Sequence, residues 1–127
     1  MVCLDTNVVV AYLKGDENII KKMKENNIDL SKLSVTAITI YELLCYPSRK
    51  REAQVYEFIS NVTTYDFDTN ASIEAAKIQR ELAASGKIID PPDIMIAATA
   101  ISKNETLVTK DLAFENIGSK NIIVIKP

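Results

Sequence analysis

Apolar residues in this chain fall into short continuous runs separated by stripes with helical spacing. Short apolar runs bounded by polar residues are typical of buried β-strands in a parallel sheet. Apolar residues at intervals of three and four indicate amphipathic helices. The strands predicted in this way are residues 2–5, 33–37, 62–67, 106–109 and 122–125.

The helical stripes lie between these strands. In the longest, Ala71, Ala75, Ile78 and Leu82 recur at spacings of four, three and four, which is one face of a helix. The apolar run of the first strand continues to Leu13, so that strand should lead directly into a helix. The other helices expected are residues 16–26 with Asp16 as N-cap, 39–46 halted at Pro47, 52–60, 69 or 70 to near Gly86, and 91–102, with a short helical turn between the last two strands.

Alternation of strands and helices predicts an α/β fold with a parallel sheet covered on both faces. We therefore expect one three-layer α/β/α domain over residues 1–127, with about five strands. Ligands of such open sheets bind outside the carboxyl ends of the strands, near the point where strand order reverses. Candidate site residues are therefore those that follow the strands or lie in helices that pack beside the strand ends.

Composition narrows the chemistry. The chain has 127 residues, a net charge of −2 and no histidine. Lack of histidine excludes a Ser-His-Asp triad, a Cys-His nucleophile and a His-ligated metal centre. The first residues contain no basic segment of a secretory signal, and no apolar run approaches the roughly 18 residues of a membrane span. We expect a cytoplasmic protein without a membrane partner, in which Cys3 and Cys45 are reduced and buried, rather than joined in a disulfide or bound to zinc.

Four acids lie where an α/β fold would place a site. Asp5 ends the first strand inside an apolar run, and Asp111 directly follows the fourth. Glu42 lies in the apolar helix ITIYELLCY, and Asp93 begins a helix with small residues one turn on. Each has an ordinary alternative: Asp93 and Asp111 would suit helix N-termini, Asp5 a turn or cap, and Glu42 an ion pair. Four separate explanations are less economical than one shared pocket.

A hard divalent cation is the physical reason to gather four carboxylates. Mg²⁺ takes oxygen ligands, keeps several waters and is commonly held by carboxylates together with substrate phosphates. Without a cation the like charges would repel one another and raise their pKa values. A bound cation would also let an acidic protein engage a nucleic acid.

At these residues the sequence resembles the PIN-domain ribonucleases, and more narrowly the VapC toxins of toxin–antitoxin modules. Four blocks in the family's order carry the resemblance over the whole chain: LDTNVVVAYL, TIYEL, PDIMIAATA and LVTKDLAF. The resemblance implies a PIN-like fold and a Mg²⁺- or Mn²⁺-dependent endoribonuclease. Asp5 and Asp93 would bind the primary metal, with Glu42 and Asp111 completing the catalytic cluster directly or through water. It also implies three partners, namely an RNA substrate, a cognate antitoxin and a second copy of the chain.

Polar residues near the acids are open to two interpretations. Thr109 and Asn7 match polar positions of the family blocks, but Ala113 stands where the last block often has a second acid, and Lys110 sits beside Asp111. Asp90 is either an outer acid of the site or a helix-start residue before two prolines. The run at residues 49–51, Arg-Lys-Arg, is either a solvated surface or an RNA-backbone contact.

Two other classes of protein remain as alternatives. A PIN-like module that binds RNA or a protein without cutting would explain the missing second acid at Ala113. An aspartyl-phosphate receiver or phosphatase fits poorly, because no acid precedes Asp5 and the chain has Asp5-Thr6-Asn7 where a phosphatase would have DxD.

Overall fold

The computed structural model describes residues 1–45 and 48–126. Its strands form one five-stranded, all-parallel sheet in the order β3-β2-β1-β4-β5. The strands are β1 (Val2–Leu4), β2 (Leu33–Thr36), β3 (Thr63–Tyr65), β4 (Thr106–Thr109) and β5 (Ile122–Val124). The helices are α1 (Thr6–Leu13), α2 (Glu17–Glu25), α3 (Ala37–Leu44), α4 (Arg49–Ile59), α5 (Thr69–Ala84), α6 (Pro91–Ser102) and the 3₁₀ helix η1 (Leu112–Ile117).

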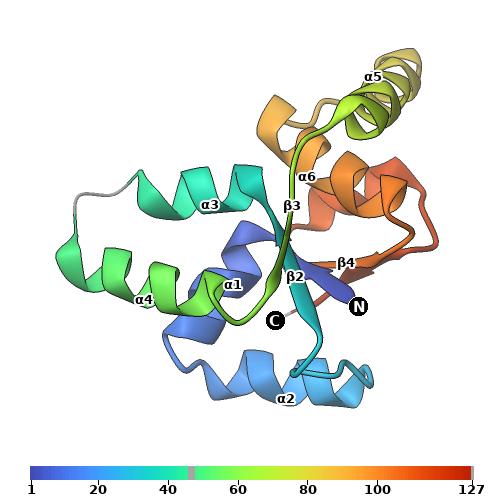
Figure 1. The fold of residues 1–127 in the computed structure, drawn as a ribbon. Coiled ribbons are helices and arrows are strands. Elements are labelled where there is room, and N and C mark those ends of the chain that lie inside the picture. The colour runs from blue at the N-terminus through green and yellow to red at the C-terminus, as the bar shows by residue number, and fades with distance from the viewer. Residues whose placement is uncertain (46–47, 127) are drawn as a thin grey trace.

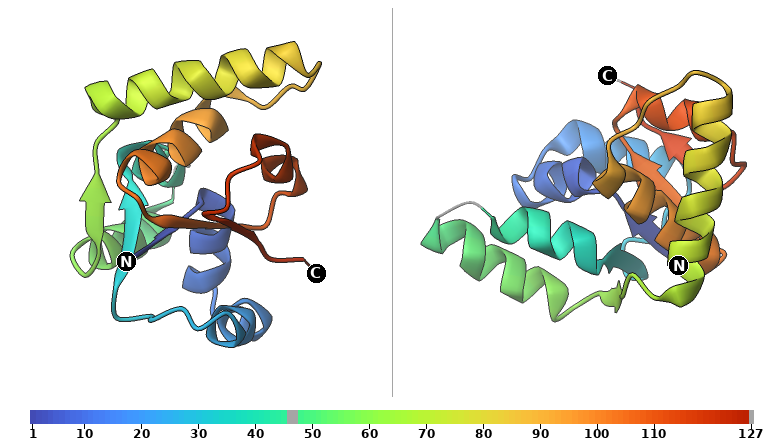
Figure 2. Two further views of the ribbon diagram at one scale, coloured as in Figure 1. Left: turned by 90° about the vertical axis from the view of Figure 1, so that its right-hand side faces the viewer. Right: turned by 90° about the horizontal axis from the view of Figure 1, so that it is seen from above.

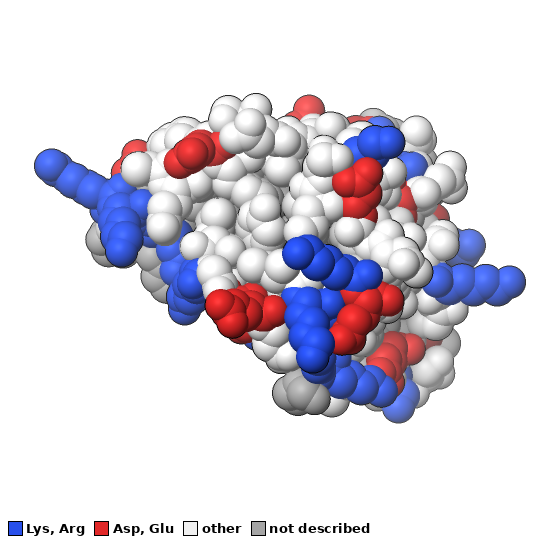
Figure 3. All heavy atoms as spheres, turned by 90° about the horizontal axis from the view of Figure 1, so that it is seen from below, with Lys and Arg blue, Asp and Glu red and all other residues white. Residues whose placement is uncertain are grey.

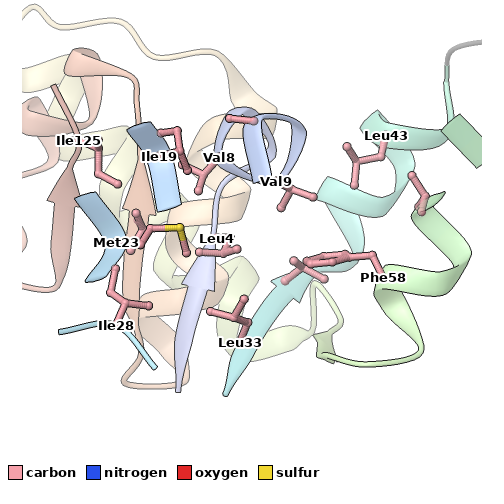
Figure 4. Packing of buried hydrophobic residues seen from close by; sticks show 14 residues of the cluster. Leu4, Val8, Val9, Ile19, Met23, Ile28, Leu33, Leu43, Phe58 and Ile125 are labelled. Carbon is pink, nitrogen blue, oxygen red and sulfur yellow. The ribbon is translucent and has the colours of Figure 1, made fainter. Parts of the chain in front are cut away.

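Helices cover both faces of the sheet, as Figures 1 and 2 show. Successive side chains of a strand point to opposite faces, so Leu4 and its neighbour Cys3 enter different cores. Leu4 joins Val8, Met23 and Phe58 beneath α1, α2 and α4 (Figure 4). On the other face Cys3 packs with residues of α6, β4 and η1. The predicted three-layer α/β/α fold is confirmed.

The predicted helices are present, with some boundaries shifted. α3 begins at Ala37 because the Thr36 hydroxyl accepts a hydrogen bond from the Thr39 amide. α4 begins at Arg49 after the N-cap Ser48, so the basic run opens this helix instead of preceding it. The expected end of the preceding helix at residue 46, before Pro47, lies outside the described residues. Within those residues, no helix is both long and apolar enough to cross a bilayer.

The prediction for the cysteines is half wrong. Cys3 is buried and free, as expected, but Cys45 is free and exposed. Cys45 is the C-cap of α3, one residue past its last turn, and the helix turns Thr39 and Leu43 inward instead. The apolar run of the sequence therefore includes Cys45, which is not on the helix face that packs in the core.

Strand order reverses next to the central strand. From β1 the chain proceeds to β2 and β3 on one side, and then crosses to β4 and β5 on the other. The carboxyl ends of β1 and β4 flank this switch point, where Leu4 is paired with Val108. Open α/β sheets bind ligands at such a position, and Asp5 and Asp111 follow these two strands.

Candidate metal and active site

Asp5 lies at the carboxyl end of β1 and caps the start of α1. Its backbone amide donates to the Val108 carbonyl at 2.9 Å, which continues the sheet one residue past the strand. The side chain is only 3% exposed. Oδ1 accepts from the Thr6 amide at 2.8 Å, and Oδ2 accepts from the Thr109 hydroxyl at 2.7 Å. Both oxygens of this buried carboxylate are therefore held in fixed directions.

Glu42 reaches the same region from the second turn of α3. The Thr6 hydroxyl donates to Glu42 Oε1 at 2.6 Å and lies 3.0 Å from the Thr39 hydroxyl. Thr6 thus touches two acids, with its amide on Asp5 and its hydroxyl on Glu42. Glu42 makes no ion pair among the described residues, so the alternative that it neutralises a nearby Lys or Arg is not supported.

Asp111 follows β4 as the N-cap of η1. Its Oδ1 accepts from the Ala113 amide at 2.9 Å, and its own amide donates to the Thr109 hydroxyl at 3.0 Å. Thr109 consequently links Asp5 to Asp111 across the gap between β1 and β4. Capping and a site role are compatible, because Oδ2 of Asp111 is not used by the cap.

Asp93 lies in the first turn of α6, after Pro91 and Pro92, and is half-buried. Burial, followed by the negative charges of Asp5, Glu42, Asp111 and Asp90, raises its pKa to about 6. Such charge effects require proximity, so Asp5, Glu42 and Asp111 lie near enough to Asp93 to raise its pKa. Asp90 occupies the N-cap position of α6 but makes no capping hydrogen bond with its side chain.

The pKa of Asp5 is also raised. Burial is the main cause, and the charges of Glu42 and Asp111 add to it, whereas the hydrogen bonds from Thr109 and Thr6 lower it. The threonines therefore favour the ionised form of a carboxylate that its surroundings would otherwise protonate. A buried carboxylate whose pKa is raised by its surroundings and lowered by hydrogen bonds is typical of functional sites.

The residues fit a hydrated divalent cation. All donors are carboxylate or hydroxyl oxygens, the ligands that Mg²⁺ and Mn²⁺ prefer. Among the residues that the structure describes, no three Asp, Glu or Cys side chains already converge as ligands on one point. A cation bound here would therefore keep part of its water shell and contact some of the carboxylates through water.

Two further polar residues frame the site. The Lys110 amide donates to Asn7 Oδ1 at 3.2 Å, which joins the loop after β4 to the first turn of α1. Lys110 itself is exposed. Thr6 and Thr39 were not expected from the sequence, since their contacts span 33 and 36 residues of chain. The only available signal was the position of Thr6, next to Asp5.

Comparisons with known proteins identify the family of the chain. A family model of the PIN domain matches residues 2–120. The chain belongs to the PIN-domain family. This PIN domain is 36% identical over 121 residues to the tRNA(fMet)-specific endonuclease VapC of Salmonella typhimurium. The match covers 90% of this chain and 89% of that relative. It is 32% identical over 121 residues to Ribonuclease VapC2 of Haemophilus influenzae, with coverage of 90% and 89%.

Solved structures show the same fold for this PIN domain. The crystal structure of DNA-bound VapBC from Salmonella typhimurium includes a chain with a TM-score of 0.78 and 31% identity, covering 99% of this chain and 98% of that one. A toxin–antitoxin complex from Klebsiella pneumoniae gives a TM-score of 0.80 at 15% identity and covers both chains completely. The second likeness concerns the fold alone.

Proposed function

We propose that this PIN domain is a Mg²⁺- or Mn²⁺-dependent endoribonuclease and the toxin of a VapBC-type toxin–antitoxin pair. The observation that carries this proposal is that the charges of Asp5, Glu42 and Asp111 raise the pKa of Asp93. Relatives of the chain named as ribonucleases support it. Asp5 and Asp93 would bind the primary metal. Glu42 and Asp111 would complete the site, directly or through water.

The chain's own residues account for the order of the site. Thr109 and the Thr6 amide fix the two oxygens of Asp5, and the Thr6 hydroxyl fixes one oxygen of Glu42. A bound divalent cation would lower the pKa of a water and offset charge on the phosphate. Carboxylates that are already oriented hold such a cation without reorganisation during the reaction.

Transfer RNA is the first substrate class to test. Relatives from Salmonella typhimurium and Shigella flexneri are named tRNA(fMet)-specific endonucleases, at 36% and 29% identity. The site would also be silenced by a protein partner, because the structural relatives include VapBC complexes. A second copy of the chain is the other partner that we propose.

Metal-dependent cleavage tests the proposal. Wild-type protein should cut a panel of structured RNAs that includes initiator tRNA, and chelation should abolish cutting. Glu42→Gln and Asp93→Asn keep side-chain size and should each lower the rate by at least about a hundredfold. Glu81→Gln, which changes an exposed acid of α5, is the matched control and should cut at the wild-type rate.

Two results would contradict the proposal. RNA cleavage by Glu42→Gln at the wild-type rate would leave Glu42 without a role in the site. RNA binding without cleavage, in either metal and over the whole panel, would instead favour a PIN-like module that binds without cutting.

A further inference from the structure

Two hollows on the surface meet at Lys14, the residue that follows α1. One hollow, of about 400 Å³, is lined by Leu13, Lys14, Ser48, Lys50, Arg51 and Gln54. The other, of about 220 Å³, is lined by Asn7, Val10, Ala11, Lys14, Asp16 and Lys110. Because Lys14 lines both, the two hollows adjoin at the C-terminal end of α1, and we treat them together as one depression.

One end of this depression lies near the acidic site in the chain. Asn7 accepts the hydrogen bond from the Lys110 amide, and Lys110 directly precedes Asp111. From Asn7 to Lys14 is seven residues, about 10 Å along a helix axis. The lining of the depression therefore extends from Asn7, past two turns of α1, to the first turn of α4.

Cations dominate its lining. Lys110, Lys14, Lys50 and Arg51, which we call the basic track, face a single acid, Asp16. The carboxylate of Asp16 is turned to the start of α2, where it accepts from the amides of residues 18 and 19 at 3.0 and 3.4 Å. Within the described residues, no salt bridge involves a member of the basic track.

Other lysines of the protein are differently placed. Around α2, Lys21 and Lys24 share a hollow with Glu17 and Glu25. Figure 3 shows this contrast: basic and acidic side chains are intermixed around α2, whereas basic side chains gather at the left end, where α4 begins. The basic track is thus a local concentration of positive charge in a protein with a net charge of −2.

We propose that the basic track holds the sugar–phosphate backbone of single-stranded RNA and guides it to the acidic site. This inference rests on the proposed function, because it takes the acids as the place of cleavage. Unpaired cations along a shallow groove suit a polyanion. The acids themselves repel a polyanion and offer it only their bound cation, so basic residues nearby would add to the affinity for RNA.

Binding can be separated from cleavage by working without metal in an Asp93→Asn background. The probe is a fluorescent, unstructured RNA of about 12 nucleotides, and its dissociation constant is measured by anisotropy between about 50 and 200 mM salt. The test variant is Lys14→Gln, Lys50→Gln, Arg51→Gln. The matched control is Lys21→Gln, Lys24→Gln, Lys120→Gln, which removes the same charge from exposed positions elsewhere.

The test variant should bind at least about tenfold more weakly at low salt, and its log–log salt slope should fall by about 2, or roughly 0.7 per lost phosphate contact. The control should leave both quantities near their starting values. With all four acids restored, the test variant should lose activity on long RNA through a higher KM, while cleavage of a trinucleotide too short to reach Lys50 should remain.

Equal affinity and slope for the test variant and its control would overturn the proposal. So would a loss confined to antitoxin binding, which would assign the surface to a protein partner. If wild-type protein cuts no RNA, the proposed function fails, but the salt slope still decides whether the basic track binds RNA. If wild type cuts RNA and the slopes are equal, only the basic track is wrong.

Discussion

Threonine hydroxyls organise the acidic site at the scale of single residues. Thr109 donates to Asp5 and accepts from the Asp111 amide, and Thr6 contacts both Asp5 and Glu42. A hydroxyl can donate and accept at once, so Thr109 links Asp5 and Asp111 through its hydroxyl alone. Thr6 instead uses its amide on Asp5 and its hydroxyl on Glu42. Orientation of the carboxylates therefore depends on residues that carry no charge.

Thr109→Val tests this dependence. Valine has the shape of threonine without the hydroxyl, so buried Asp5 would lose the donor to Oδ2 and its pKa would rise further. We expect metal affinity and cleavage rate to fall about 10- to 100-fold, and the acidic limb of the pH–rate profile to move to higher pH. Titration calorimetry and initial rates measure both. A pH profile identical to that of wild type would show that Thr109 is only a packing residue.

Asp93 makes the stability of the metal-free protein depend on pH. Its pKa is raised from the ordinary 3.8 to about 6 in the folded state. Between about pH 4 and pH 6 the folded state therefore holds more protons than the unfolded state, and the free energy of unfolding decreases as pH rises. Melting temperatures in chelator should fall across this window, and added Mg²⁺ should restore them above it.

Asp93→Asn should flatten that dependence and be more stable than wild type above pH 6 in chelator. Loss of an acid from the first turn of α6 opposes this by up to about 1 kcal/mol, so the slope with pH is a better measure than the absolute stability. Glu81→Gln serves as the control. An unchanged slope in Asp93→Asn would mean that the pKa of Asp93 is not raised in the folded protein.

The sequence singles out the acids but not the residues that hydrogen-bond to them. Asp5 and Glu42 stood out because both lie in apolar segments, where an unpaired carboxylate is rare. Thr6 did not stand out, since a threonine at a helix start is common and its partners Thr39 and Glu42 lie more than thirty residues away. Hydrogen bonds between distant segments depend on the packed fold and leave no local pattern.

At the scale of elements, the site depends on how α1 and α3 are joined. Thr6 stands in the first turn of α1, and Glu42 in the second turn of α3. Thr6→Val would remove the hydroxyl between them and leave the Thr6 amide on Asp5 intact. We expect cleavage to fall about 10- to 100-fold with little change in melting temperature, measured by initial rates and thermal unfolding.

Thr69→Val is a suitable control, because Thr69 is an exposed threonine at the start of another helix, α5. Thr6→Ser should recover most of the activity by returning the hydroxyl. If Thr6→Val cuts RNA as fast as wild type, Glu42 is positioned by α3 alone.

Helix cores were predicted better than helix ends. The stripe of α5 was found because Ala71, Ile78 and Leu82 are all buried on one face. The start of α4 was missed because residues 49–51 have no apolar periodicity, and its signal is the cap Ser48, whose hydroxyl accepts from the Arg51 amide at 3.3 Å. A single cap is a weaker signal than a repeated stripe.

At the scale of the whole molecule, the topology explains why the acids meet. β1 and β4 are neighbours in the sheet although about a hundred residues separate them, and α3 and α6 begin at the same edge of the sheet. The order of strands was not predicted from sequence, because apolar runs specify that strands form but not which strands pair. Without that order, proximity of Asp5 and Asp111 stayed an expectation.

Inhibition by the antitoxin should act on this same acidic site. Asp5 and Asp93 both have raised pKa values, partly because each faces the charges of other acids. A cation would relieve that repulsion in the inhibited state. An Arg is the expected choice, since its planar fork can engage two carboxylates and it stays charged at any cellular pH. Antitoxin and divalent metal should consequently compete.

Antitoxin affinity measured with and without Mg²⁺ tests this expectation. Mg²⁺ should weaken the wild-type complex, and Asp5→Asn or Asp93→Asn should weaken it further while removing its dependence on Mg²⁺, because neither ligand then has the full carboxylate set. Glu81→Gln should bind like wild type. Equal affinity for all of these proteins in both conditions would mean that the antitoxin inhibits from a distant surface, since a competitor for the carboxylates must respond to their charge.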